Sequence, residues 1–374
     1  MSNKNDFVIE NNTLIRYSGD ECNVTVPDHI IAINEFAFYD MHNIVKITLP
    51  ESLKRIENYA FMRCSKLAEI KLPDFLTDIG IAAFGMCTSL KRIILPTSLT
   101  SLKEEAFLFC TSFESVAIPK SVTEIGSGVF DGCISLSEIT VDVDNPDYTS
   151  IDGVLYNKDV SRMIAYPEGK KETRFSFPNT ITSICPDALK NLKSIHSITM
   201  SNSLTEIPDS AFFDFRNLTS VVLPQSILKI GKSAFVKCEN LTSIVLPDNI
   251  SVIAESVFEG CTNLKSIVLP SGLKEIQKNA FLGCASLKTV YYKGEKKDFD
   301  PLGAQHTDYF SGKSSINDEL YDLSGVERVY CNGKVTVEDW NDSILVADWY
   351  YYSEDAPTED GNFWRYVNGV PTRW

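Results

Sequence analysis

Cysteine is the residue type with which this chain could most readily do chemistry, because thiolates bind zinc, form disulfides and attack electrophiles. The chain has ten cysteines and no Cys-x-x-Cys pair. Because cysteines that stand in different copies of a repeat cannot converge on one ion, we interpret the regularly spaced ones as buried packing residues. Seven of them recur at one position of a 23-residue period: Cys64, Cys87, Cys110, Cys133, Cys238, Cys261 and Cys284.

Other catalytic patterns are incomplete. Gly312-Lys313-Ser314 resembles the end of a phosphate-binding loop, but Thr307 stands where that loop needs its first glycine. The histidines form no His-Glu-x-x-His motif, and we interpret them as surface or packing residues: His29, His42, His196 and His306. We therefore predict no catalytic residues, no cofactor and no enzymatic activity.

An acidic cluster, Asp142, Asp144, Asn145 and Asp147, offers the oxygen ligands that calcium prefers. Pro146 occupies a position at which a calcium loop needs a ligand. We interpret the cluster as an acidic turn, with a calcium site as the alternative, and predict no metal site.

Charge and composition limit the classes of partner. The net charge of -15 argues against nucleic acid and anionic membrane surfaces, because both require clustered Lys and Arg. No stretch reaches the roughly 18 apolar residues of a membrane span, and the start, MSNKNDFVIE, lacks a signal-peptide pattern. As written, the chain reads as cytoplasmic, without membrane insertion, and we predict a monomer that binds a protein.

A 23-residue repeat dominates the sequence. A proline column and an aromatic column keep the same interval, so a chance coincidence is excluded. The first column is Pro27, Pro50, Pro73, Pro96, Pro119, Pro178, Pro224, Pro247 and Pro270, and the second is Phe38, Phe61, Phe84, Phe107, Phe130, Leu189, Phe212, Phe235, Phe258 and Phe281.

The unit from Leu264 to Cys284 combines two periodicities. Ile267 and Leu269 alternate as on one face of a short strand, which ends at Pro270. The later apolar residues, spaced by three or four, predict a turn or short helix that returns the chain over the core. One such unit buries too little apolar surface to fold alone, so neighbouring units must stack.

The Ile-x-Leu-Pro and Ala-Phe-x-x-Cys motifs resemble the BspA-like leucine-rich repeats of surface and secreted bacterial proteins, over residues 20 to 292. The resemblance implies an α/β, β-rich fold: a right-handed leucine-rich-repeat solenoid, or horseshoe, with a parallel concave sheet and a hairpin insertion. It also implies a role in adhesion or surface recognition, and a secreted or cell-surface location.

The segments of the chain follow from the repeat. Pro119 and Pro178 are separated by one repeat plus an enlarged one of 36 residues, and Asp152-Gly153 within it signals a hairpin. We predict an N-terminal capping hairpin at 1–22, repeats at 23–142, the enlarged repeat at 143–177, repeats at 178–292, a degenerate cap at 293–331 and an aromatic module at 332–374.

The residues that point outward from each predicted strand are candidates for binding. In the first half these pairs are charged or mixed, from Lys46 and Thr48 to Glu138 and Thr140. In the second half they form a serine and a valine column that predict a partner-binding stripe: Ser220, Val222, Ser243, Val245, Ser266, Val268 and, beyond them, Tyr291. The alternative is that duplication merely copied residues that suit a crowded ladder.

The aromatic tail has two interpretations. All four tryptophans lie in the last 35 residues. They form either a lid over the last coil or a set of sugar-stacking platforms. The second interpretation gives the alternative function, carbohydrate or cell-wall binding through Trp349, Tyr351, Trp364 and Tyr366.

Overall fold

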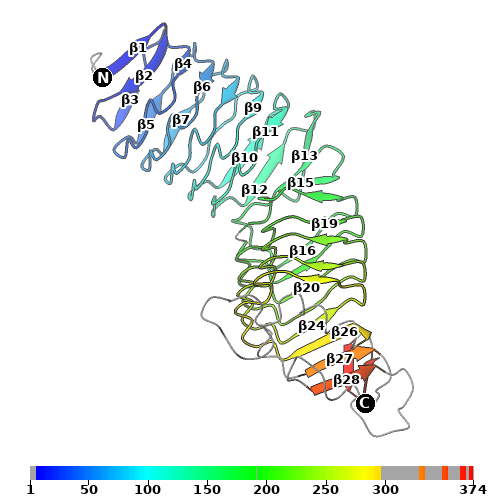
Figure 1. The fold of residues 1–374 in the computed structure, drawn as a ribbon. Helices are drawn as coiled ribbons and strands as arrows, with labels where there is room; N and C mark the ends of the chain where they lie inside the picture. The colour runs from blue at the N-terminus through cyan, green and yellow to red at the C-terminus, as the bar shows by residue number, and fades with distance from the viewer. Residues whose placement is uncertain are drawn as a thin grey trace. The chain divides into compact units, whose positions relative to one another are not determined.

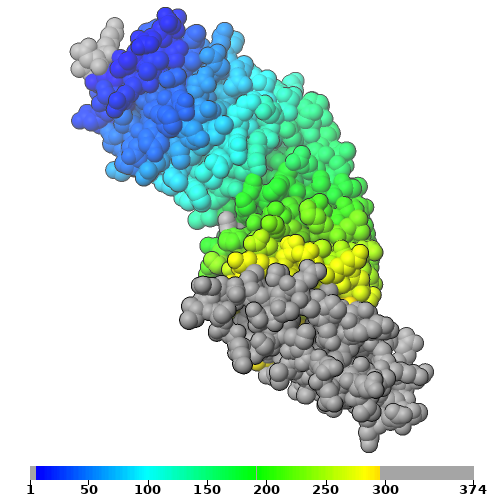
Figure 2. All heavy atoms as spheres, viewed as in Figure 1, coloured from blue at the N-terminus to red at the C-terminus, as the bar shows by residue number. Residues whose placement is uncertain are grey.

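The computed structural model describes residues 6–190, 192–295, 328–332, 348–352, 363–367 and 370–373, with side chains described up to residue 294. The chain forms two compact units. The N-terminal unit comprises Met1–Lys171 and Asp187–Leu189, and the C-terminal unit comprises Glu172–Pro186 and Lys190–Trp374. In each unit, successive coils stack in sequence order (Figures 1 and 2).

Most ordinary coils contribute one strand to a long-strand ladder and one to a short-strand ladder. The coil of Arg92 joins the first ladder only through a single bridge to Ser115. Val24, Ile47 and Ile70 are register partners in the long-strand ladder, so neighbouring coils are offset by one repeat of 23. In the N-terminal unit the long strands are β3 (Asn23–Thr25), β5 (Lys46–Thr48), β7 (Glu69–Lys71), β10 (Ser115–Ile118) and β12 (Glu138–Val141). The short strands are β4 (Ala32–Ile33), β6 (Arg55–Ile56), β8 (Asp78–Ile79), β9 (Ser101–Leu102) and β11 (Glu124–Ile125).

An antiparallel pair begins the N-terminal unit. β1 (Phe7–Glu10) pairs with β2 (Thr13–Tyr17), which pairs in parallel with β4. Asn11 and Asn12 connect them with φ values of 47° and 59°, a backbone region that asparagine tolerates. The rings of Phe7 and Tyr17 are buried at the end of the core.

Three antiparallel strands occupy the enlarged repeat. β13 (Tyr148–Ile151) pairs with β14 (Val154–Asn157), which pairs with β15 (Arg162–Ala165). Asp152 and Gly153 connect the first two with positive φ angles of 49° and 75°. The extra residues therefore fold on each other and leave the ordinary coils in register.

The C-terminal unit repeats the two ladders. Its short strands are β17 (Ser183–Ile184), β19 (Glu206–Ile207), β21 (Lys229–Ile230), β23 (Val252–Ile253) and β25 (Glu275–Ile276). Its long strands are β16 (Arg174–Ser176), β18 (Ser197–Thr199), β20 (Ser220–Val222), β22 (Ser243–Val245), β24 (Ser266–Leu269) and β26 (Thr289–Glu295). The sheet continues through β27 (Arg328–Asn332), β28 (Asp348–Tyr352), β29 (Phe363–Val367) and β30 (Val370–Arg373).

Of the predicted turn or short helix, the helix is wrong and the turn is observed. The described elements are all strands, so the α/β class is corrected to a β-solenoid of stacked parallel coils. In the segment after β6, the amides of Tyr59, Phe61 and Arg63 donate to carbonyls of the next coil at 2.7–2.8 Å. The intervening amides donate three residues back. Tyr59 and Arg63 have φ values of 56° and 66°, a left-handed conformation that a right-handed helix cannot contain.

The phenylalanine column fills the centre of both units. From Phe38 to Phe130, and again from Phe212 to Phe281, neighbouring rings lie 5.0–5.9 Å apart and within 17° of parallel. Leu189 occupies the same position and is also buried. Ring stacking therefore repeats with the same period as the backbone ladders.

The thiol column lies beside the rings. Each of its seven buried cysteines donates from Sγ to the carbonyl oxygen of the phenylalanine in the preceding coil, at 3.1–3.3 Å. Burial raises the pKa of Cys64 and of Cys110 to about 12. The cysteines therefore serve as packing groups in seven of the coils, and their raised pKa keeps the thiols of Cys64 and Cys110 protonated at neutral pH.

Replacing Phe84 tests the ring stack. Phe84 is fully buried between Phe61 and Phe107, so Phe84→Ala should lower the free energy of unfolding by about 3–5 kcal/mol. Phe84→Leu, which copies Leu189, should cost on the order of 1 kcal/mol because it leaves a smaller cavity. Urea denaturation measures both, and equal losses would contradict the stacking account.

Thiol labelling at pH 10 tests the thiol column. An ordinary cysteine, with a pKa of about 8.5, is then a thiolate, whereas Cys64 and Cys110 should stay protonated because burial raises their pKa to about 12. We expect a maleimide to modify the exposed Cys22 in the folded protein and the column only after denaturation. Peptide mapping identifies the modified sites, and labelling of Cys110 at the rate of Cys22 would refute the assignment.

Candidate functional site

The outer face of the long-strand ladder in the C-terminal unit carries the predicted serine and valine columns. Because side chains alternate along a strand, Ser220 and Val222 are exposed while Val221 between them is buried. Ser220 donates to the Ser197 hydroxyl of the preceding coil at 3.3 Å. Val222 is 63% exposed and Val245 on the adjacent strand is 48% exposed.

The column residues of the next strand, β24, are less exposed to solvent. Val268 is the register partner of Val245 but is only 4% exposed. Ser266 and Tyr291 are half-buried. The freely exposed part of the predicted stripe therefore consists of Ser220, Val222, Ser243 and Val245.

The same face of the N-terminal unit has a different character. Lys46 Nζ lies 2.8 Å from Glu69 Oε2 across neighbouring strands, and Lys71 pairs with Glu51 at 3.3 Å. Ile94 is 81% exposed and occupies the position that Val222 and Val245 occupy in their coils. The valine column is thus a property of the C-terminal unit.

The four candidate glycan-binding residues of the tail lie in strands that extend the sheet. Trp349 and Tyr351 in β28 share the register of Val329 and Cys331, and through these strands the register of the core residues Val290 and Tyr292. Trp364 and Tyr366 lie in β29. The side chains of all four lie outside the described residues.

The acidic cluster is held by hydrogen bonds to the neighbouring backbone. Asn145 is buried, and its side chain binds the carbonyls of Pro119 and Val122 and accepts from the amides of Asp147 and Tyr148. The acidic cluster is therefore organised as a turn. In residues 6–190 and 192–294, no group of three His, Cys, Asp or Glu side chains could hold a metal ion. His306 and the Gly312-Lys313-Ser314 segment lie outside the described residues.

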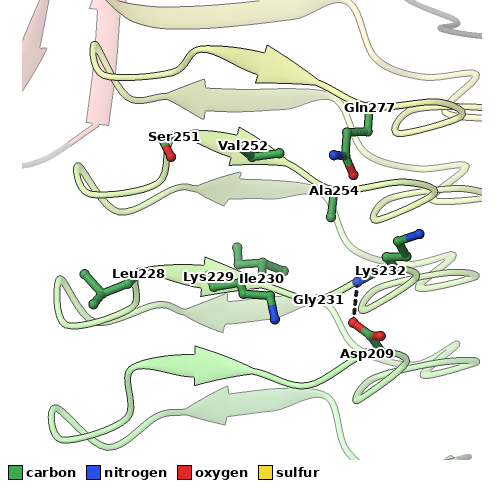
Figure 3. A pocket seen from close by; sticks show the side chains of 10 residues that line it. All are labelled: Asp209, Leu228, Lys229, Ile230, Gly231, Lys232, Ser251, Val252, Ala254 and Gln277. Atoms are coloured by element: carbon green, nitrogen blue, oxygen red, sulfur yellow. Dashed lines mark hydrogen bonds between the residues drawn. The ribbon is translucent and has the colours of Figure 1, made fainter.

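A hollow of 460 Å³ on the short-strand ladder of the C-terminal unit was not predicted (Figure 3). Its floor lies where Ser251, Val252 and Ala254 carry small side chains. Most corresponding positions of the neighbouring coils carry longer side chains, including Leu228, Lys229 and Gln277, and Gly231 is the exception. A coil with small residues between two coils with long ones was the sequence signal that could have revealed it.

Paired charges surround this hollow. The Lys232 amide donates to Asp209 Oδ1 at 2.8 Å, and its ammonium lies 3.1 Å from Glu255. Lys229 forms an ion pair with Glu206, which raises the pKa of the lysine. Because both lysines are neutralised, the hollow offers no strong anion site.

No described helix has the length and apolar character that a membrane span requires.

No curated protein sequence matches the chain significantly. Among solved structures, a leucine-rich cell surface protein from Faecalibacterium prausnitzii is 26% identical, with a TM-score of 0.65 over 79% of this chain and 95% of that one. The pneumococcal vaccine antigen PcpA is also 26% identical, with a TM-score of 0.73 over 88% and 78% of the two chains.

A leucine-rich repeat protein from Eubacterium ventriosum shares the fold at 20% identity, with a TM-score of 0.65 over 96% of this chain and 92% of that one. The family model of the BspA type leucine-rich repeat region matches residues 15–147 and 165–291 in six copies. These residues include the phenylalanine and thiol columns of both units. The chain therefore belongs to the BspA type leucine-rich repeat family.

Proposed function

We propose that this chain is a non-catalytic repeat scaffold that binds a protein partner on the exposed part of the serine and valine columns. The observation that supports the proposal is the exposure of Val222 and Val245, at 63% and 48%, on the neighbouring strands β20 and β22. Exposed aliphatic side chains on a rigid surface release water when a partner covers them. A right-handed horseshoe, as the sequence predicts, would place them on its concave face.

The related structures agree with a scaffold role. One of them is described as a cell surface protein and another as a vaccine antigen. By analogy with these two proteins, we propose a role in adhesion or surface recognition. The protein partner would then lie outside the cell. The glycan alternative through Trp349, Tyr351, Trp364 and Tyr366 has less support, since two of these residues share the register of core positions.

Charge substitution on the valine column tests this proposal. We expect the double variant Val222→Glu, Val245→Glu to lose a partner that the unchanged chain captures, because a carboxylate must be desolvated in an apolar contact. Ile94→Glu is the matched control, since Ile94 has the same strand position in the other unit and is 81% exposed.

Capture is measured by pull-down, and a photo-crosslinking residue at position 222 or 94 identifies what contacts each surface. A partner that is crosslinked at 222, and lost only in the double variant, supports the proposal. Capture that depends equally on position 94, or on neither position, contradicts it.

The burial of Val268 gives a separate prediction for stability. Val268→Glu should lower the free energy of unfolding by roughly 2 kcal/mol or more, because it buries a charge at a site that is 4% exposed. Val222→Glu should change it by no more than about 0.5 kcal/mol. Urea denaturation of the two variants checks this. Similar stabilities would contradict the difference in burial between Val268 and Val222.

A further inference from the structure

Three aromatic side chains gather on the turn segments of the first two ordinary coils in the N-terminal unit. The rings of Phe36 and Tyr59 stack with centroids 5.1 Å apart and planes 6° from parallel. Tyr39 contacts Phe36 edge-on at 5.5 Å. Phe36 is 49% exposed and Tyr39 is 38% exposed. We call Phe36, Tyr39 and Tyr59 the aromatic platform.

The fold does not require aromatic residues at these positions. Phe36 and Tyr59 have φ values of 59° and 56°, in a region that bulky side chains rarely adopt. Their rings lie outside the phenylalanine column, which uses Phe38 and Phe61 instead. In other coils the same position is occupied by residues such as Gly128, Ser210, Ser233, Ser256 and Asn279. Phe36, which is exposed, and Tyr59, which is half-buried, are thus kept here at a conformational cost.

Planar polar groups lie directly beside the aromatic platform. Asp40 Oδ1 lies 3.0 Å from Arg63 Nε and 3.2 Å from His42 Nε2. A hydrogen bond from Arg63 to Tyr39, together with the charge of Asp40, raises the pKa of the guanidinium. The side chains of Asp40, His42 and Arg63 are between 42% and 57% exposed. Both ring nitrogens of His42 are engaged, because Nδ1 also lies 3.3 Å from Ser65 Oγ. Asp40 and Arg63 have further acceptor and donor atoms that can face a ligand.

The next coil has alanine in place of an aromatic residue at this position. Ala82 follows Tyr59 in the same column, and its small side chain is buried. The amides of Tyr59 and Tyr39 are fixed by hydrogen bonds to the carbonyls of Ile81 and Phe36, at 2.8 and 3.1 Å. The rings are thus held by a backbone that hydrogen bonds already order, and the ring stack ends at Tyr59.

We propose that the aromatic platform binds a neutral glycan. The C–H faces of a sugar ring would pack on the aromatic surface, and its hydroxyls would exchange hydrogen bonds with Asp40 and Arg63. The positive charge of Arg63 is balanced by Asp40, which disfavours anionic glycans and nucleic acid. Because ion-paired groups border the rings, the surface suits a ligand that combines apolar C–H faces with hydroxyls.

Titration of the full chain with neutral oligosaccharides tests this proposal. The probes are cellohexaose, laminarihexaose, maltohexaose, mannohexaose and N-acetylchitohexaose, and binding is measured by calorimetry and by saturation-transfer NMR. We expect at least one of these oligosaccharides to bind with a Kd of about a millimolar or lower. The double variant Phe36→Asn, Tyr59→Asn should weaken that binding by at least about tenfold.

The double variant is designed to fold, because asparagine tolerates a positive φ and Asn279 already occupies the same position in another coil. Unchanged circular dichroism and unfolding midpoint check this. Phe75→Asn is the matched control, since Phe75 is 65% exposed on a different turn and should not alter binding.

Failure of every probe to bind overturns the glycan assignment, as does binding that the double variant leaves intact. A protein captured through Phe36 and Tyr59 without any glycan binding would also overturn it. None of these outcomes affects the valine column, which lies in the other unit and is tested separately.

Discussion

The 23-residue interval between coils is the constraint on which the structure depends. One repeat brings backbone amides, phenylalanine rings and cysteine thiols of one coil into contact with the next. A single inserted residue within a coil would shift all three arrays at once. The chain meets this constraint in its enlarged repeat by folding the extra residues into β13, β14 and β15.

The periodic part of this fold could be predicted well from the sequence. Equivalent residues of neighbouring coils contact each other, so a residue type that packs against its own copy recurs at each repeat. The strand core at Ile267, the buried ring at Phe281 and the buried thiol at Cys284 all follow from the repeat. The helix was wrong because the apolar spacing of a helix and of successive turns is similar. Asn279 and Gly283, with φ values of 59° and 74°, were the residues that distinguish the two.

Features that depend on neighbours in space were harder to predict. Val268 has the same sequence context as Val222 and Val245, yet its exposure is 4%, since burial depends on the surroundings of β24 rather than on its own pattern. The hollow at Val252 arises from small residues in a single coil. Phe36 and Tyr59 differ from the residues at their column positions in later coils. Departures from the repeat therefore mark the candidate sites better than the repeat itself does.

Amide hydrogen exchange measured by NMR tests the central claim most directly, namely that alternate amides of the turn segments bond across coils. The amides of Phe61, Phe84 and Phe107 donate to the next coil at 2.8–2.9 Å, although they lie in no strand. The account predicts that they exchange as slowly as the core amides of β7 and β10 in the same unit. Exchange at the rate of an open surface loop would contradict it.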